Sequence, residues 1–344
     1  MKILVDIVHP ADVLFFLNPI RRWQAGGHEV IVGSRRKDVT VGLLDAFSIE
    51  HTILSSAGKN LAGLALELVM RDIAMLRFVR AERPDVLAGF GGVAISHVGK
   101  LLGVPSVSFY DTERAPLQLS LTLPFISHFY VPESYDGPIA PNRTHRFRGT
   151  KDLSYFHPDN FSPDRATAVK SGLVEGEPNY FIRLVGWQAN HDVGLVGWDA
   201  ATLESFVSYL SAQGRVHISS ELPLPASVEP FRYCGGEAQV HHLLAYCTCY
   251  IGESATMATE SVLLGVPAIY ATSDRRCYTD DLEALGLLET LTQVDYESLC
   301  SATSRVCMQD RTIIEARLDE FMRDKINLAD YVAESVLDHA DQAG

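Results

Sequence analysis

The sequence predicts an α/β protein built from two similar halves, each organised on a parallel β-sheet. Short apolar, β-rich runs alternate with longer segments that carry apolar residues at helical spacing, an order typical of parallel sheets. The pattern Leu-Gly-Val-Pro also closes a helix and leads into a strand twice, at 102–105 and at 264–267. A small-residue turn precedes the helix each time, so each half repeats one strand–helix–strand unit.

In the first half, local patterns place the elements in order. Gly26 and Gly27 end the first helix, and Gly103 with Pro105 ends the helix before the fifth strand. The expected strands are 2–8, 29–32, 50–54, 86–88, 106–110 and 124–132, and the expected helices are 13–23, 37–47, 61–81 and 93–102.

The second half follows a stretch rich in glycine and proline between 137 and 149, which indicates a domain linker. We therefore expect domains at 1–150 and 151–326, with a final helix in 327–344 that packs back on the first domain. The expected strands are 179–185, 216–219, 249–251 and 268–271, and the expected helices are 199–213, 237–245, 257–264, 280–285, 296–309, 313–326 and 328–340.

Composition excludes several classes of protein. The 344 residues carry a formal net charge of −14, which argues against a general nucleic-acid binder. Six cysteines without a CxxC pair, and a first segment that reads as a strand, favour a cytoplasmic protein. No apolar run approaches the ~20 residues that span a bilayer. The first turn lacks the Gly-x-Gly-x-x-Gly fingerprint, so no dinucleotide cofactor is expected.

The strongest candidate site is the turn between the strand that ends at Ile251 and the following helix. Gly252 is expected to end that strand, and Ser254 and Thr256 are typical residues of a helix start. Such a helix start, at the carboxyl end of a parallel strand, can hold a diphosphate. Glu260 lies one turn beyond Thr256 and can bind ribose hydroxyls. The alternative is an ordinary strand–helix–strand unit with a capped helix. The nucleotide-sugar candidates here are Gly252, Glu253, Ser254, Ala255, Thr256, Met257 and Glu260.

Arg183 and Glu221 are further nucleotide-sugar candidates in the second half. Arg183 is expected inside a strand, where a charge needs a partner, and it pairs either with a phosphate or with a carboxylate such as Glu221. Glu221 follows the next strand, where it either serves the site or caps a helix or turn. His191 lies in a polar loop and is a candidate acid/base, whereas an idle exposed histidine is the alternative.

The first half offers acceptor-side candidates at strand ends. Asp111 and Glu113 follow a strand and can include a base for an acceptor hydroxyl, or form a loop paired with Arg114. His9 lies at the first strand–helix turn, where it is either functional or a turn residue. A second helix start is a candidate acceptor contact or a close-packing turn, through Gly91, Gly92 and Ser96. Four leucines alternate with polar residues and suggest either a strand packed in the core or a lip toward a membrane-borne acceptor: Leu117, Leu119, Leu121 and Leu123.

Four segments carry a family resemblance: HPADVLFFLNPIRRWQAGGHEV, VSFYDTERAP, IRLVGWQANHDVG and IGESATMATESVLLGVPAI. They resemble the DUF354 family of uncharacterised prokaryotic proteins over nearly the whole chain. In the 252–267 stretch and the order of elements, the chain is also similar to GT-B nucleotide-sugar enzymes. These include the lipid-linked N-acetylglucosamine transferase of peptidoglycan synthesis and the non-hydrolysing UDP-N-acetylglucosamine 2-epimerase.

The resemblance implies a GT-B fold, two Rossmann-like domains with the donor nucleotide mostly on the second. It places Glu260, five residues before Gly265, where these enzymes hold the ribose, and it implies that no metal is needed. Ala255 stands near a position where many of these enzymes have glycine. We therefore expect a glycosyltransferase that uses a UDP-sugar and a saccharide or lipid-linked acceptor, with peripheral membrane contact as one option. The alternatives are a UDP-N-acetylglucosamine 2-epimerase-like enzyme and a non-catalytic nucleotide-sugar-binding protein.

Overall fold

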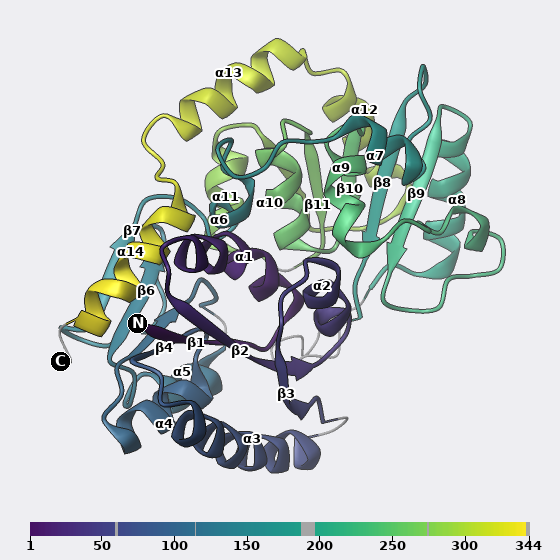
Figure 1. Ribbon diagram of the computed structural model, residues 1–344. Helices are drawn as coiled ribbons and strands as arrows, with labels where there is room; N and C mark the ends of the chain where they lie inside the picture. Colours follow the sequence, from purple (N-terminus) through teal and green to yellow (C-terminus); the bar gives the residue numbers. More distant parts are fainter. Residues whose placement is uncertain (59–60, 114, 187–196, 274, 342–344) are drawn as a thin grey trace. The chain divides into compact units, whose positions relative to one another are not determined.

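In a computed structural model, the chain forms two compact α/β units, Met1–Phe161 with Ile326–Gly344 and Ser162–Lys325 (Figure 1). The structure describes residues 1–58, 61–113, 115–186, 197–273 and 275–341. Each unit is organised on a parallel sheet, so the predicted fold class is confirmed. None of the helices in these ranges is long and apolar enough to cross a membrane.

The first unit contains a seven-stranded sheet in the order β3-β2-β1-β4-β5-β6-β7, with every neighbouring pair parallel. Its strands are β1 (Lys2–Ile7), β2 (Glu29–Arg36), β3 (Thr52–Ser56), β4 (Val86–Phe90), β5 (Ser106–Phe109), β6 (His128–Pro132) and β7 (Thr144–Phe147). Its helices are α1 (Pro10–Ala25), α2 (Thr40–Ala46), α3 (Leu61–Glu82), α4 (Val93–Leu102), α5 (Pro116–Thr122), α6 (Leu153–Phe156) and α14 (Leu328–Asp341). The reversal of strand order beside β1 is the feature at which open α/β sheets bind ligands.

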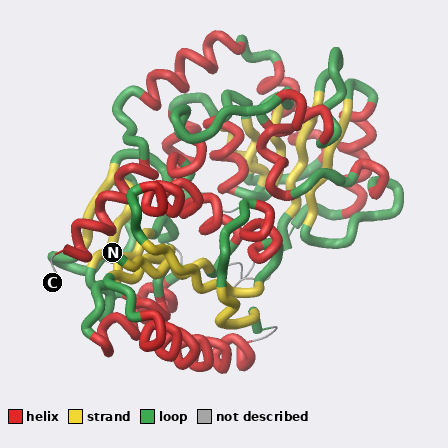
Figure 2. The backbone as a smooth tube through the Cα atoms, in the orientation of Figure 1, coloured by secondary structure: helices red, strands yellow, loops and turns green. Residues whose placement is uncertain are grey.

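Helices cover both faces of this sheet (Figure 2). On one face α1 packs against α6 and α14, and on the other α3 packs against α4. Trp23 of α1 is buried, and its indole N–H donates to the carbonyl oxygen of Ala333 in α14 at 3.0 Å. The C-terminal helix is therefore part of the first unit, which consists of Met1–Phe161 and Ile326–Gly344.

The second unit contains a five-stranded parallel sheet in the order β12-β11-β10-β8-β9. Its strands are β8 (Asn179–Leu184), β9 (Arg215–Ser220), β10 (Cys249–Gly252), β11 (Ala268–Ala271) and β12 (Leu288–Leu291). Its helices are α7 (Arg165–Lys170), α8 (Ala200–Ser211), α9 (Val240–Leu244), α10 (Ala255–Leu263), α11 (Cys277–Ala284), α12 (Tyr296–Cys307) and α13 (Arg311–Met322), with short 3₁₀ turns at Glu229–Phe231 and Glu237–Gln239.

Two apolar clusters fill the two faces of this second sheet. Tyr250 packs with residues of α9, α10 and α13 on one face. Ile251, the next residue of β10, packs with residues of α8 and α12 on the other. This alternation is the period of two that a strand imposes, and burial on both faces explains why these strands are continuously apolar.

Two expectations for the region before the second unit were wrong. The alternating leucines do not form a strand, because Pro116 occupies the first turn of a helix, α5, where its missing N–H costs nothing. Leu119 is buried, whereas Leu117 is 63% exposed. The stretch expected to be a linker contains β7, which pairs with β6 along Phe129–Pro132.

Candidate functional site

The start of α10 lies at the carboxyl edge of the second sheet, as the sequence predicted. Ser254 is the N-cap, in extended conformation, and its hydroxyl accepts the N–H of Met257 at 3.2 Å. Residues 254–257 are half-buried, and α10 itself has no acidic residue in its first turn. The positive end of the helix dipole therefore points to this edge without a carboxylate on its own first turn.

Glu253 directly precedes this helix, but its carboxylate faces other backbone groups. One oxygen accepts the N–H of Val185 at 2.9 Å and the other accepts the N–H of Trp198 at 3.2 Å. The side chain is buried and fastens the chain that follows β8 to the end of β10. Glu253 therefore has a structural role that its position next to a helix cap did not indicate.

Gly252 ends β10 as expected, and as its last residue it still pairs in register with Arg183 of β8. A Cβ atom here would lie 2.4 Å from the carbonyl oxygen and 2.9 Å from the nitrogen of Arg183. Only glycine fits, since both contacts are with backbone that cannot rotate away.

We expect Gly252→Ala to lower the free energy of unfolding by about 1–3 kcal/mol, the usual cost of forcing a methyl group into a packed site. Chemical denaturation followed by circular dichroism measures the change. Gly42→Ala is the control, because a Cβ atom at Gly42 meets nothing within 4 Å and lies inside α2. Equal stabilities of the two variants would show that the backbone of Arg183 moves away from the added methyl group without loss of stability.

Arg183 takes the second of its two predicted arrangements and pairs with a carboxylate. Its guanidinium forms an ion pair with Glu221 and donates to the hydroxyl of Ser219 at 2.7 Å. The second Glu221 oxygen accepts the N–H of Gly186 at 2.9 Å. The Arg183 side chain stays 22% exposed, so the fork is held in place at the carboxyl edge rather than sealed inside.

Glu260 is more deeply buried than a carboxylate that contacts a ribose at an open site. Its Oε2 is 2.9 Å from Nε2 of His241 on α9, and both side chains are only 6% exposed. A hydroxyl that binds this carboxylate has to share it with the imidazole. No local pattern points to His241, because it lies 19 residues before Glu260 and the two meet only in the folded unit.

The candidate base Asp111 of the first unit lies in a buried charged cluster. Its Oδ2 is 3.3 Å from Nζ of Lys151, which also contacts Oδ1 of Asp152 at 3.0 Å. Glu113 lies two residues on, and its Oε1 is buried without a hydrogen-bond partner among the described residues. A buried carboxylate oxygen of this kind is costly unless it serves a ligand or a proton.

His9 is the N-cap of α1 and is exposed at the carboxyl end of β1. Its Nδ1 accepts the N–H of Ala11 at 3.2 Å. Beside it, one oxygen of Asp12 accepts the N–H groups of Val8 and His9, each at 2.9 Å. Burial raises the pKa of Asp12 to about 7. Asp12 was not among the predicted site residues, although its spacing of three from His9 is that of a capping box.

The second helix start, at α4, has the backbone that the glycines predicted. Gly91 and Gly92 have positive φ angles of 76° and 59°, which a side chain would strain. Ser96 is fully buried, and its hydroxyl donates to the carbonyl oxygen of Val93 at 2.7 Å. That hydroxyl is therefore engaged within α4. His191 and Arg114 lie outside the residues that the structure describes.

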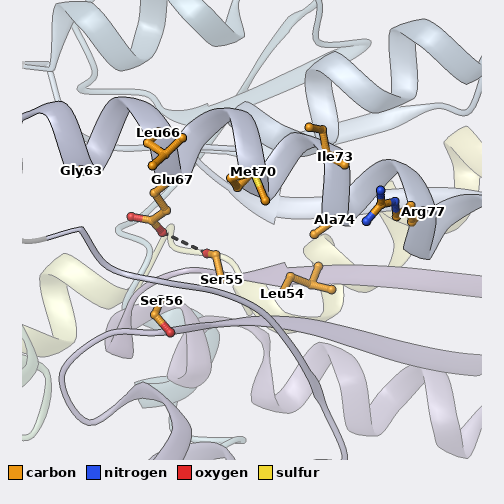
Figure 3. Close-up of a pocket in the computed structure, with 10 residues that line it drawn as sticks. All are labelled: Leu54, Ser55, Ser56, Gly63, Leu66, Glu67, Met70, Ile73, Ala74 and Arg77. Carbon is orange, nitrogen blue, oxygen red and sulfur yellow. Dashed lines mark hydrogen bonds between the residues drawn. The ribbon is translucent and has the colours of Figure 1, made fainter.

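The first unit also has a cavity of about 370 Å³ between β3 and α3 (Figure 3). Its polar wall is Glu67, which accepts a hydrogen bond from Ser55 at 2.9 Å and is paired with Arg35. Leu66 and Met70 form its apolar rim and are more than half exposed. None of the residues singled out above lines this cavity.

Comparison with known proteins agrees with this architecture. Residues 1–178 match the family described as "Protein of unknown function (DUF354)". No curated protein matches the chain.

Solved structures are similar over almost the whole chain. UDP-GlcNAc 2-epimerase from Neisseria meningitidis, bound to UDP-GlcNAc, has a TM-score of 0.68 at 10% identity, with 99% of this chain and 100% of that chain covered. The spinosyn rhamnosyltransferase SpnG, complexed with spinosyn aglycone, has a TM-score of 0.63 at 17% identity, with 96% and 99% covered. CalG4, the calicheamicin glycosyltransferase, has a TM-score of 0.62 at 15% identity, with 100% and 99% covered. These likenesses show that both units together have the GT-B fold.

Proposed function

This chain belongs to the DUF354 family, and from that premise and its GT-B fold we propose that it is a nucleotide-sugar-dependent glycosyltransferase. The observation that carries the proposal is the start of α10 at the carboxyl edge of the second sheet, beside a strand that carries Arg183. Backbone N–H groups and the helix dipole favour an anion there. The donor is a UDP-sugar whose diphosphate contacts residues 254–257.

In this reaction the second unit acts mainly by stabilising negative charge on the leaving group. An acceptor oxygen attacks the anomeric carbon, the bond from that carbon to the diphosphate breaks, and UDP departs with the electron pair. The start of α10 stabilises the growing negative charge, and the partly exposed guanidinium of Arg183, which Glu221 holds at the carboxyl edge, adds to this, so transfer needs no metal ion. The ribose hydroxyls bind Glu260 through the carboxylate that His241 orients.

The first unit provides the acceptor side of the reaction. Glu113, with its buried unpartnered oxygen, is the preferred base for the acceptor hydroxyl. Asp111 and His9 are the other candidates, and Gly91 and Gly92 form the turn that leads into α4. The acceptor is a saccharide, either free or lipid-linked, and the exposed Leu117 is the residue of α5 that suits the second form.

Nucleotide binding tests the donor site directly. UDP is expected to raise the melting temperature, and uridine, which lacks phosphate, is expected to raise it much less. Glu260→Gln should weaken UDP binding about tenfold, since a hydrogen bond to a charged group contributes ~1.5 kcal/mol or more. Isothermal titration calorimetry measures both affinities.

The matched control is Glu229→Gln, at an exposed carboxylate of the same unit that is paired with Arg232. It should leave UDP affinity unchanged. If Glu260→Gln lowers the melting temperature but binds UDP as the wild type does, the Glu260–His241 pair is structural only. If UDP does not stabilise the wild type, the whole donor site is wrong.

A UDP-GlcNAc 2-epimerase-like activity is the second candidate, favoured by the higher TM-score of the Neisseria meningitidis epimerase. An epimerase returns a proton to the sugar and needs no acceptor. Incubation with UDP-GlcNAc alone, followed by NMR, separates the two activities. The epimer without any acceptor would support the epimerase, and turnover only after an acceptor is added would support the transferase. Binding without turnover in either experiment would indicate a non-catalytic binder.

A further inference from the structure

Three histidines from distant parts of the chain meet at the amino edge of the first sheet. His128 begins β6, His145 is the second residue of β7, and His339 lies near the end of α14. One ring nitrogen from each lies within 4.8 Å of the other two. The candidate residues of the first unit lie at the opposite, carboxyl edge, so this cluster is separate from them.

The sheet register explains why the three rings converge. His128 and Tyr130 are two residues apart on β6 and therefore point to one face of the sheet. His145 pairs in register with Tyr130, and the two rings stack with centroids 4.5 Å apart. Helix α14 lies over this face, and its His339 places Nε2 2.8 Å from the hydroxyl of Tyr130.

The distances suit a metal ion held by nitrogen. Nδ1 of His128 is 3.3 Å from Nε2 of His145. Two nitrogens bound at ~2.0–2.1 Å to a tetrahedral zinc ion are separated by about the same distance. The rings of His128 and His339 are stacked at 3.4 Å, so one of them has to turn to aim its nitrogen at the same point.

The surroundings of the three imidazole rings also favour binding of a metal ion over binding of a proton. Metals bind the neutral form of imidazole. Burial lowers the pKa of His128 to about 4 and lowers the pKa of His145 as well. The hydroxyl of Tyr130 holds the ring of His339 by a hydrogen bond, as partners behind metal ligands do.

We propose that His128, His145 and His339 form a binding site for one divalent ion of the zinc class, and that the ion fastens α14 to the sheet. Three imidazoles are a ligand set that zinc, nickel and copper prefer, whereas magnesium and calcium prefer oxygen. Water completes the fourth position. The role is structural, since the ion joins β6, β7 and α14 at the edge away from the candidate residues.

The test uses the full chain with any polyhistidine tag removed and with metal stripped by a chelator. Titration with Zn²⁺ should show one ion bound per chain, and Zn²⁺ should raise the melting temperature. His145→Gln and His339→Gln should each weaken binding by more than ~10-fold, and Tyr130→Phe should weaken it less. His157→Gln is the control, at a half-buried histidine outside the cluster, and it should bind as the wild type does.

Absence of Zn²⁺ binding to the wild type would overturn the proposal, as would unchanged binding in both cluster variants. X-ray absorption at the zinc edge of the wild type provides a measurement that does not depend on the variants folding. A first shell of nitrogen and oxygen with imidazole scattering supports the site. A shell containing sulfur would overturn it, because the cysteines lie elsewhere in the chain.

Discussion

Replacement of Arg71 by methionine should lower the free energy of unfolding by about 3–5 kcal/mol, because it leaves a buried carboxylate without its cation. Arg71 of α3 forms an ion pair with Asp6 of β1, and both side chains are almost fully buried. Its guanidinium also donates to the hydroxyl of Ser55 at 2.8 Å. Burial raises the pKa of Asp6, and Arg71 opposes that rise. The buried carboxylate therefore depends on Arg71 for its stabilisation.

Chemical denaturation of the single and double variants measures this effect. The double variant Asp6→Leu with Arg71→Leu removes both charges and should be clearly more stable than Arg71→Met. Arg77→Met is the control, on the same helix at the rim of the cavity. It should change the stability by less than ~1 kcal/mol. A cost for Arg71→Met no greater than this control would refute the argument.

The second large effect concerns Asp12 and pH. Burial raises the pKa of Asp12 from 3.8 to about 7, so the folded state keeps a proton that the unfolded chain releases. The stability from this group is therefore full below pH 3.8 and is lost as pH rises through 7. We expect the wild type to lose about 2–3 kcal/mol from this group between about pH 5 and pH 8.

Asp12→Asn isolates this contribution, since the amide oxygen can still accept the N–H groups of Val8 and His9. The difference in unfolding free energy between variant and wild type should grow by that amount over the range. Comparison with the wild type is needed because burial lowers the pKa of His217 to about 4, which acts in the opposite direction. A difference that stays constant with pH would mean that Asp12 is ionised throughout.

Sequence reasoning succeeded where the signal is local. The predicted helix 61–81 is α3 (Leu61–Glu82), and the final helix 328–340 is α14 (Leu328–Asp341). Ser254 caps α10 as its residue type indicates. Period, caps and helix-ending glycines act over a few residues, so the chain itself carries them.

Local signals failed where two patterns competed. Alternating leucines at 117–123 have the period of a strand, but a proline at the first helical position and packing of Leu119 produce α5. Gly252 ends β10 as the pattern predicts, but the pattern does not show that the backbone of β8 comes too close for any residue with a Cβ atom. Neighbouring strands therefore decided what the pattern could not.

The sequence by itself determined that the chain is an α/β protein of two similar halves, with a helix starting at the carboxyl edge of a strand in each. Only the tertiary structure decided the partners of the charged and polar side chains. Arg183 meets Glu221, Glu260 meets His241, and three histidines from β6, β7 and α14 converge. The reason is physical. Backbone geometry is set by residues that are close in the chain, so a local pattern predicts it. The partner of a buried charge is set by the packing of elements that are distant in the chain.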